Sequence, residues 1–320
     1  MRRNWLLILL TACASSSPIA APQPPNTNLG ACSLFPKNNI WNTSIAKLPV
    51  DKSSSSYVSS IGNTVGLHAD FGSGLYQGQP IGIPYVVVPA NQAGVKISTF
   101  LYDDESDHGL YPIPVNPPIE GGASSKGDRH ILIVREGECK LYEVGNAYPN
   151  TDGSWRVGAG AIWDLKSNAL RPNTWTSADA AGLPILPGLI RHDEVAAGVI
   201  PHAIRFTADI TQQAFIWPAR HQAGSSSATT VPPMGARFRL KAGFNTASYP
   251  KDVQVILEAL KTYGMILADN GSNWFLSGTQ DEAWDNDVLS SISKVKGSDF
   301  EAVDSSSLIV NPDSGEAKSQ

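Results

Sequence analysis

Short apolar segments separated by glycine and proline are the feature that most restricts how this chain can fold. Residues 81–89 form a β-branched segment bounded by proline, and residues 95–100 alternate apolar and polar side chains, as a half-buried strand does. Residues 130–134 and 139–144 flank a short polar stretch that contains a glycine, which predicts a hairpin. The 28 glycines and 23 prolines provide turns for many short strands. We therefore predict a mainly β fold, an antiparallel sandwich or open barrel with a few peripheral helices.

Further strands and two helices are predicted in the second half of the chain. Residues 203–207 and 214–217 are expected to pair as strands, and residues 236–240 alternate cleanly between apolar and polar. A helix is expected from about Lys251 to Tyr263, and a second near residues 285–295. The apolar stripe of the first helix consists of Val253, Ile256, Leu257 and Leu260.

The first residues of the chain read as an export signal. Two arginines precede the apolar run 5–10, which is far shorter than the roughly 20 residues that a membrane-spanning helix needs. The run ends in LTAC, which resembles the bacterial lipobox, where cleavage precedes a cysteine that then carries acyl chains. We expect residues 1–12 to be a lipoprotein signal peptide, Cys13 to be the lipid anchor, and the Ser- and Pro-rich residues 13–30 to be a tether. An ordinary signal cleaved nearby is the alternative.

We expect the protein to be exported and lipid-anchored at the cell envelope, on its periplasmic or outer surface. A protein in that location meets oxidising conditions. With Cys13 assigned to lipid, two cysteines remain, so a disulfide between Cys32 and Cys139 is expected, with two buried free thiols as the alternative. Residues 31–311 are expected to form a single β-rich domain and residues 312–320 a disordered tail. A net charge of -5 and a pI near 5.7 argue against nucleic acid and anionic membrane surfaces as main partners. Membrane contact is expected through the lipid alone.

The densest polar cluster is a loop at residues 102–112. It holds four carboxylates within five residues, which repel one another, so some must meet a cation, a metal or water. Asp104, Glu105 and Asp107 are candidate catalytic carboxylates, and Tyr111 is a candidate substrate contact. A solvated loop is the alternative reading. Calcium fits the density of oxygen atoms, although the spacing is not that of an EF-hand, and no motif predicts a zinc site.

A second cluster follows in the sequence RHDE, residues 191–194, and continues to His202 and Arg205. A histidine beside carboxylates and arginines can act as a general base whose charge is stabilised. Alternation along the strand places His202 and Arg205 on opposite faces, so they would share a cleft only with a bulge. The candidates here are Asp193, Glu194 and His202 for catalysis, and Arg191, Arg205 and the more distant His221 for substrate binding. A hydrogen-bonded framework histidine is the alternative for His202.

A third candidate region is the stretch 267–287, where tryptophans alternate with aspartate and asparagine. An aromatic face for the CH groups of a pyranose, beside planar acceptors for its hydroxyls, is what a sugar-binding surface requires. Asp269 is a candidate catalytic carboxylate, and Trp274 and Trp284 are candidate substrate contacts.

Several phrases of the sequence resemble those of a known family. They are LFPKNNIWN, DESDHGLYPIP, IEGG, GDRHILIV, GLPILPGLIRHDEVAAG, HAIRFT, WPARH and YGMILADNGSNWF. They resemble a family of secreted β-rich proteins from soil bacteria, over nearly all of the chain from about residue 32 to residue 310. The resemblance implies one exported domain. It implies no particular activity and no catalytic residue.

An extracellular carbohydrate-active enzyme is the leading hypothesis for the function. The chain lacks GxSxG, GxGxxG and Walker motifs, so we expect neither a serine hydrolase nor a nucleotide cofactor. A glycoside hydrolase needs two carboxyl groups, about 5 Å apart for retention and wider for inversion. One would come from the acidic loop and the other from Asp193, Glu194 or Asp269, with His202 as a modulator. Polysaccharide is the expected partner.

Two alternatives remain open. A polysaccharide lyase would use His202 or Tyr111 as the base, with Arg191 or Arg205 offsetting the carboxylate of the substrate. A non-catalytic glycan-binding envelope lipoprotein explains the tether and the aromatic residues equally well.

Overall fold

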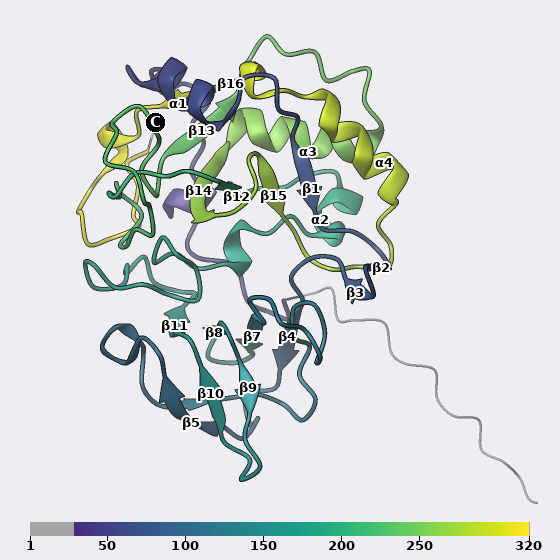
Figure 1. Cartoon of the computed structure of the whole chain (residues 1–320), viewed down its shortest axis with the longest axis vertical. Coiled ribbons are helices and arrows are strands. Elements are labelled where there is room, and N and C mark those ends of the chain that lie inside the picture. The colour runs from purple at the N-terminus through teal and green to yellow at the C-terminus, as the bar shows by residue number, and fades with distance from the viewer. Residues whose placement is uncertain (1–28, 320) are drawn as a thin grey trace, which may run out of the picture.

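The computed structural model describes residues 29–319. The predicted signal peptide, the lipid anchor at Cys13 and most of the tether therefore lie outside the described residues. The view in Figure 1 shows a stack of two small sheets at one end and a larger sheet with the helices at the other. The fold is mainly β, as predicted, and it contains a sandwich and no closed barrel within the described part of the chain.

The middle layer is a four-stranded sheet in the order β11-β8-β7-β4. Its strands are β4 (Tyr85–Val88), β7 (Ile131–Arg135), β8 (Lys140–Val144) and β11 (Gly160–Asp164). The predicted hairpin is confirmed, because β7 and β8 pair antiparallel. Ile131 and Ile133 enter one hydrophobic core, whereas Leu132 and Val134 enter the other. Since both faces of this sheet are buried, its central strand is a continuous apolar run.

The outer layer is a second four-stranded sheet, in the order β6-β5-β10-β9. Its strands are β5 (Val95–Phe100), β6 (Leu110–Tyr111), β9 (Tyr148–Pro149) and β10 (Trp155–Val157). The two sheets approach closely at Gly160, where an added Cβ would lie 2.5 Å from the hydroxyl oxygen of Tyr111. Tyr111 is therefore a core residue, with 0% of its surface exposed.

The third layer is a six-stranded sheet in the order β1-β15-β12-β14-β13-β16. Its strands are β1 (His68–Asp70), β12 (Ile204–Ala208), β13 (Arg237–Leu240), β14 (Met265–Asn270), β15 (Phe275–Ser277) and β16 (Phe300–Val303). The sheet is mixed, since β1 pairs parallel with β15 and β12 with β14. The predicted pairing of residues 203–207 with 214–217 is wrong, because both edges of β12 are occupied by β14 and β15. Phe215 makes only an isolated bridge to Met234.

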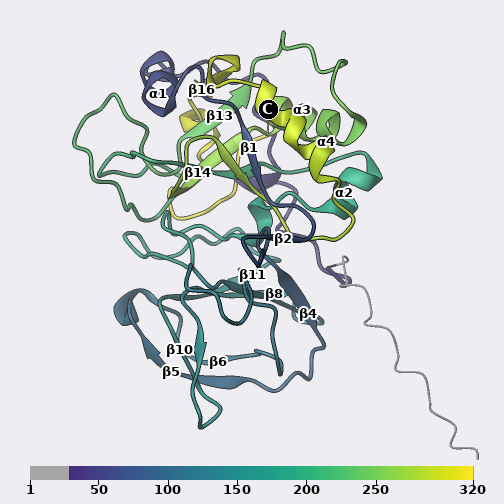
Figure 2. The same cartoon turned by 45° about the vertical axis from the view of Figure 1, so that its right-hand side comes forward.

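The helices gather around the six-stranded sheet (Figures 1 and 2). They are α1 (Ser54–Ile61), α2 (His192–Ala197), α3 (Lys251–Thr262) and α4 (Asn286–Ser290), with 3-10 helices at Ile40–Asn42, Asp103–Glu105, Leu186–Gly188, Ser291–Lys294, Gly297–Asp299 and Ser306–Leu308. The helix predicted at 251–263 is confirmed, and its predicted apolar stripe is buried. The second predicted helix is confirmed as α4 and the following 3-10 turn, with Asp285 as its N-cap. No helix within residues 29–319 is long and apolar enough to cross a membrane.

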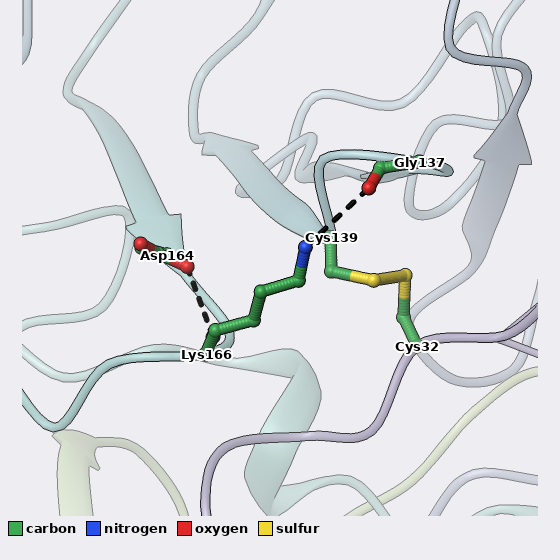
Figure 3. The surroundings of a disulfide bond; sticks show 5 residues. All are labelled: Cys32, Gly137, Cys139, Asp164 and Lys166. Carbon is green, nitrogen blue, oxygen red and sulfur yellow. Dashed lines mark hydrogen bonds between the residues drawn. A yellow bond between two sulfur atoms is a disulfide. The ribbon is translucent and has the colours of Figure 1, made fainter.

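The disulfide between Cys32 and Cys139 is present, as predicted. Figure 3 shows that it ties the first described segment to the turn that precedes β8. The same turn is held from the other side by Lys166, whose Nζ donates to the carbonyl oxygen of Gly137 at 3.4 Å. The covalent link thus fixes the N-terminal segment to the middle sheet.

The C-terminal residues are packed as far as residue 319, in contrast to the disordered tail that we expected for 312–320. Glu316 bridges to Asn39, and Ala317 bridges to Ile309. Ala317 is 5% exposed. Backbone hydrogen bonds to earlier segments hold this stretch in place, and its local composition gives no sign of such distant partners.

Candidate functional site

Three neighbouring cavities lie along one side of the six-stranded sheet. Their volumes are about 470, 260 and 380 Å³. The first and second share Asp70, Tyr76 and Ile81 in their linings, and the second and third share Gly127 and Asp128. Because each cavity shares lining residues with the next, we refer to the three together as the groove.

One end of the groove is aromatic. His68 of β1 stacks on Phe275 of β15 with ring centroids 4.1 Å apart. Tyr76 lines the same end and the middle segment, and it is 69% exposed. It lies on a small hairpin formed by β2 (Leu75–Tyr76) and β3 (Gln79–Pro80). An exposed aromatic ring beside a groove is able to stack on a sugar ring.

Arg205 of β12 is the centre of a buried charge network at the other end. Alternation along β12 places Arg205 on the opposite face from the core residues Ile204 and Phe206. Its Nε and Nη2 donate to the two carboxylate oxygens of Asp179 at 2.8 and 2.7 Å. Its Nη2 also donates to Asp269 at 2.9 Å.

The remaining contact of this guanidinium is to β15, because Nη1 donates to the hydroxyl of Ser277 at 2.6 Å. The adjacent carboxylates of Asp179 and Asp269 raise the pKa of Arg205 against the effect of its burial. Because Nε, Nη1 and Nη2 all donate hydrogen bonds, Arg205 links β12 to β14, β15 and Asp179 and is not available to a substrate.

Asp269 is the member of this network that reaches the groove. It lies on β14, its side chain is 25% exposed, and it lines the third cavity. Burial and the neighbouring charge of Asp179 raise its pKa to about 7, although Arg205 and His130 act in the opposite direction. At neutral pH roughly half of the molecules therefore carry a proton on this carboxyl group. A carboxyl group with such a pKa can act as a general acid.

A second charged pair, His130 and Glu120, lies between the middle and third segments of the groove. The Nδ1 of His130 is 2.6 Å from Oε2 of Glu120, and its Nε2 is 2.9 Å from the carbonyl oxygen of Ala178. Burial alone would lower the pKa of His130, but the carboxylate of Glu120 outweighs it and raises the pKa to about 9. Because both ring nitrogens face acceptors, the imidazole is doubly protonated and cannot serve as a base.

The lining of the groove is acidic. Four carboxylates line it, namely Asp70, Glu120, Asp128 and Asp269. Neither lysine nor arginine occurs in the lining of the three cavities within the described residues. His221 lines the third cavity, and its Nδ1 donates to the carbonyl oxygen of Ala180, 2.8 Å away. The groove therefore suits a neutral or cationic ligand better than an anionic one.

The second predicted cluster lies elsewhere. Arg191 pairs through Nη2 with Glu194, whose other oxygen lies 3.1 Å from Nε2 of His202. Asp193 lies 3.5 Å from Nε of Arg191. These residues line two cavities that share no lining residue with the groove. His202 and Arg205 thus serve different sites, which agrees with the alternation argument.

The acidic loop contributes to the framework more than to the groove. Asp107 pairs with Arg171 and accepts from the backbone N–H of Ile162. Glu105 accepts from the backbone N–H of Thr176 at 2.8 Å and lies 3.9 Å from Nε2 of His221, so it is the only one of the three candidates near the groove. Asp104 is exposed. Within residues 29–319 no group of three or more acidic, histidine or cysteine side chains is placed to hold a metal ion.

The aromatic residues predicted to bind sugar lie in the core instead. Trp274 is fully buried and stacks between Phe206 and Phe300, while its indole N–H donates to Gly62. Trp284 is 4% exposed. Like Tyr111, both lack an open face for a ligand. Burial of a large aromatic ring is strongly favourable, so both tryptophans pack in the core. The polar residues next to them in the sequence had suggested a binding surface.

Comparison with known proteins identifies no relative: no family model, curated protein or solved structure matches this chain. Membership of the soil-bacterial family therefore remains a prediction.

Several residues of the groove and of the network behind it carry no motif in the sequence. Asp70, Tyr76, Glu120, Asp128 and His130 line the groove, and Asp179 pairs with Arg205 behind it. No sequence pattern connects Asp70 with Asp269. The sequence holds a weak signal for Glu120 and His130. Glu120 lies in the phrase IEGG and His130 in the phrase GDRHILIV, which both belong to the resemblance.

Proposed function

We propose that the protein hydrolyses an extracellular glycan, with Asp269 as the general acid. The observation that carries this proposal is a carboxyl group with a pKa of about 7 on the wall of an open groove. A carboxyl group with a raised pKa is partly protonated at neutral pH, so it can donate a proton to a glycosidic oxygen. In the lysozyme-type arrangement, burial likewise raises the pKa of one carboxyl group, which acts as the acid, above the pKa of its ionised partner.

Asp128 is the partner that we assign to Asp269. It lines the same cavity, is exposed to solvent, and belongs to the segment before β7, whereas Asp269 belongs to β14. In the proposed step, Asp269 gives its proton to the leaving oxygen as the glycosidic bond breaks. Asp128 accepts a proton from the water molecule whose oxygen attaches to the anomeric carbon.

A polymeric, non-acidic glycan is the substrate class that we assign. The groove continues over three cavities, which suits a chain of sugars, and Tyr76 offers a ring for stacking. The absence of lysine and arginine from its described lining disfavours a polyuronate. A lyase would need a free cation beside the carboxylate of the substrate, whereas Arg205 is already engaged and Arg191 lines no cavity of the groove. The predicted export signal supports an extracellular substrate.

The test is incubation of the protein with a panel of neutral, amino-sugar and uronate polysaccharides. Reducing ends should appear without the ultraviolet absorbance of an unsaturated product. Asp269→Asn should lower the rate by about 10²- to 10⁴-fold and remove the decline in rate above pH 7. Asp209→Asn is the matched control, because Asp209 is exposed and lines none of the three cavities.

Three outcomes would count against the proposal. Unchanged activity of Asp269→Asn would remove Asp269 as the acid. An unsaturated product would indicate a lyase. Binding of a glycan by the folded protein without any cleavage across the panel would favour the non-catalytic alternative, in which the network of Arg205 is purely structural.

A further inference from the structure

A separate cavity of about 270 Å³ lies next to β4 and the start of α2. Its walls are the strand residues Tyr85 to Val87 with the flanking Pro84 and Pro118, the segment Arg191 to Asp193, and the segment Thr279 to Glu282. It shares no lining residue with the groove. Its volume is at the lower end of the roughly 300–1,000 Å³ typical of small-molecule sites, so it fits a single small group.

Arg191 is the unusual feature of this cavity. It is 7% exposed, and only its Nη2 is paired, with Glu194. Its Nε and Nη1 have no hydrogen-bond partner, and among the described residues they are the only buried side-chain polar atoms in this condition. The nearest carboxylate oxygen to Nε, in Asp193, is 3.5 Å away, beyond the usual range of a hydrogen bond.

Buried donors without partners cost free energy, so proteins rarely keep them without a purpose. Arg191 also lines a cavity of about 540 Å³ on its other side, so its side chain forms part of the wall between the two cavities. As a lining residue, Arg191 is within reach of a group bound in the smaller cavity. An acceptor placed there would then satisfy a donor that the chain itself leaves unmatched.

The remaining lining defines the chemistry of that acceptor. Asp193, Asp281 and Glu282 are acidic, which disfavours an anion. The prolines and Val86 and Val87 supply an apolar wall. A neutral carbonyl that carries a short alkyl group meets both conditions. Burial raises the pKa of Tyr85 to about 12, so its hydroxyl stays protonated as a further donor.

We propose that this cavity binds the acetamido group of an N-acetylated amino sugar, with its carbonyl oxygen on Arg191 and its methyl group against Val87, which shares the face of β4 with Tyr85. The choice of a sugar rests on the proposed function. The acetyl group itself is inferred from the unpaired donor and the apolar wall.

The experiment measures binding of an N-acetylglucosamine oligomer to the full chain by titration calorimetry, beside the same oligomer after deacetylation. Arg191→Lys keeps a charge for Glu194 but loses the guanidinium donors, and Val87→Phe fills the cavity from β4 while Arg191 itself is unchanged. We expect at least tenfold weaker binding of the acetylated oligomer by either folded variant, and at least tenfold weaker binding of the deacetylated one by the unchanged protein. Arg156→Lys, on the distant strand β10, is the matched control.

Equal binding of the two oligomers would overturn the inference, as would undiminished binding by Val87→Phe or no binding of the acetylated oligomer at all. Thermal unfolding identifies a variant that does not fold, in which case the other variant decides. Release of reducing ends is measured separately. Cleavage that persists while the acetyl dependence is absent would reject this cavity and leave the proposed hydrolase intact.

Discussion

Replacement of His130 by glutamine should remove a specific pH dependence of stability. The pKa of this imidazole is about 9 in the folded protein, against an ordinary value of 6.5. Because the pKa is raised on folding, the contribution of the group is fully present below pH 6.5 and is lost as the pH rises through 9. Glutamine carries no charge for Glu120 to stabilise, so this loss should disappear in the variant.

The magnitude follows from the difference between the two pKa values. Each unit of pKa difference corresponds to about 1.4 kcal/mol, so the difference of about 2.5 gives about 3 kcal/mol. Between about pH 7 and 8.5 the unfolded chain has released this proton and the folded chain has not. The free energy of unfolding should therefore fall by about 1.4 kcal/mol per pH unit in that window.

Urea unfolding at a series of pH values from 7.5 to 9.5 measures this slope. Two buried carboxyl groups act below the window, and Arg237, whose pKa burial lowers to about 9, acts only at the upper end of the range and in the opposite direction. Burial raises the pKa of both Asp269 and Glu143 to about 7, and a raised carboxyl pKa removes stability as the pH rises towards that value. His108→Gln is the control, since His108 is exposed. Glu120→Gln should abolish the slope as well, because it removes the charge that holds the proton.

Parallel curves for the unchanged protein and His130→Gln would refute the reasoning. They would mean that the pair between His130 and Glu120 does not hold a proton in the folded state. An equal slope in Glu120→Gln would assign the proton uptake to another group.

Three further predictions concern stability and the site. Serine at both Cys32 and Cys139 should lower the free energy of unfolding by about 5 kcal/mol, measured in urea, because the bond closes a loop of sequence separation 107. Glu143→Gln should cost about 1–3 kcal/mol in the same assay, because its carboxylate accepts N–H donors that an amide NH₂ would oppose; an unchanged midpoint would contradict this. Asp179→Asn should lower the pKa of Asp269 by about 1 unit or more, because it removes a neighbouring negative charge, and the high-pH limb of the rate profile should move to lower pH.

The parts of the fold that the sequence predicts are those decided by local patterns. The hairpin of β7 and β8, the strand β5 and the helix α3 each carry their periodicity and their end signals within a few residues. The pairing of β12 cannot be predicted from such local patterns. Its neighbours β14 and β15 are more than fifty residues away in the chain, and the packing of the core determines which strands pair. The disordered tail was predicted for the C-terminal segment for the same reason, because the partners of that segment lie far away in the chain, near Asn39 and Asn168.

The same distinction between local and distant contacts applies to the candidate site. Asp269 was predicted from polar residues beside aromatic ones, but the tryptophans that suggested it are core residues. Its real partners come from segments far apart in the chain. Arg205 lies 64 residues away from it, and Asp179 lies 26 residues from Arg205. A motif search cannot join residues that only a three-layer fold brings together.

The position of the proton in this network follows from the contacts of a single arginine. Arg205 gives two N–H groups to Asp179 and one to Asp269, so the charge of Asp179 is better compensated. A quarter of the Asp269 side chain is exposed and reaches the groove. Two carboxylates that share one cation cannot both be fully stabilised as anions. Burial and the charge of Asp179 therefore raise the pKa of Asp269, the carboxyl group with fewer contacts to Arg205, and that is the one that faces the groove.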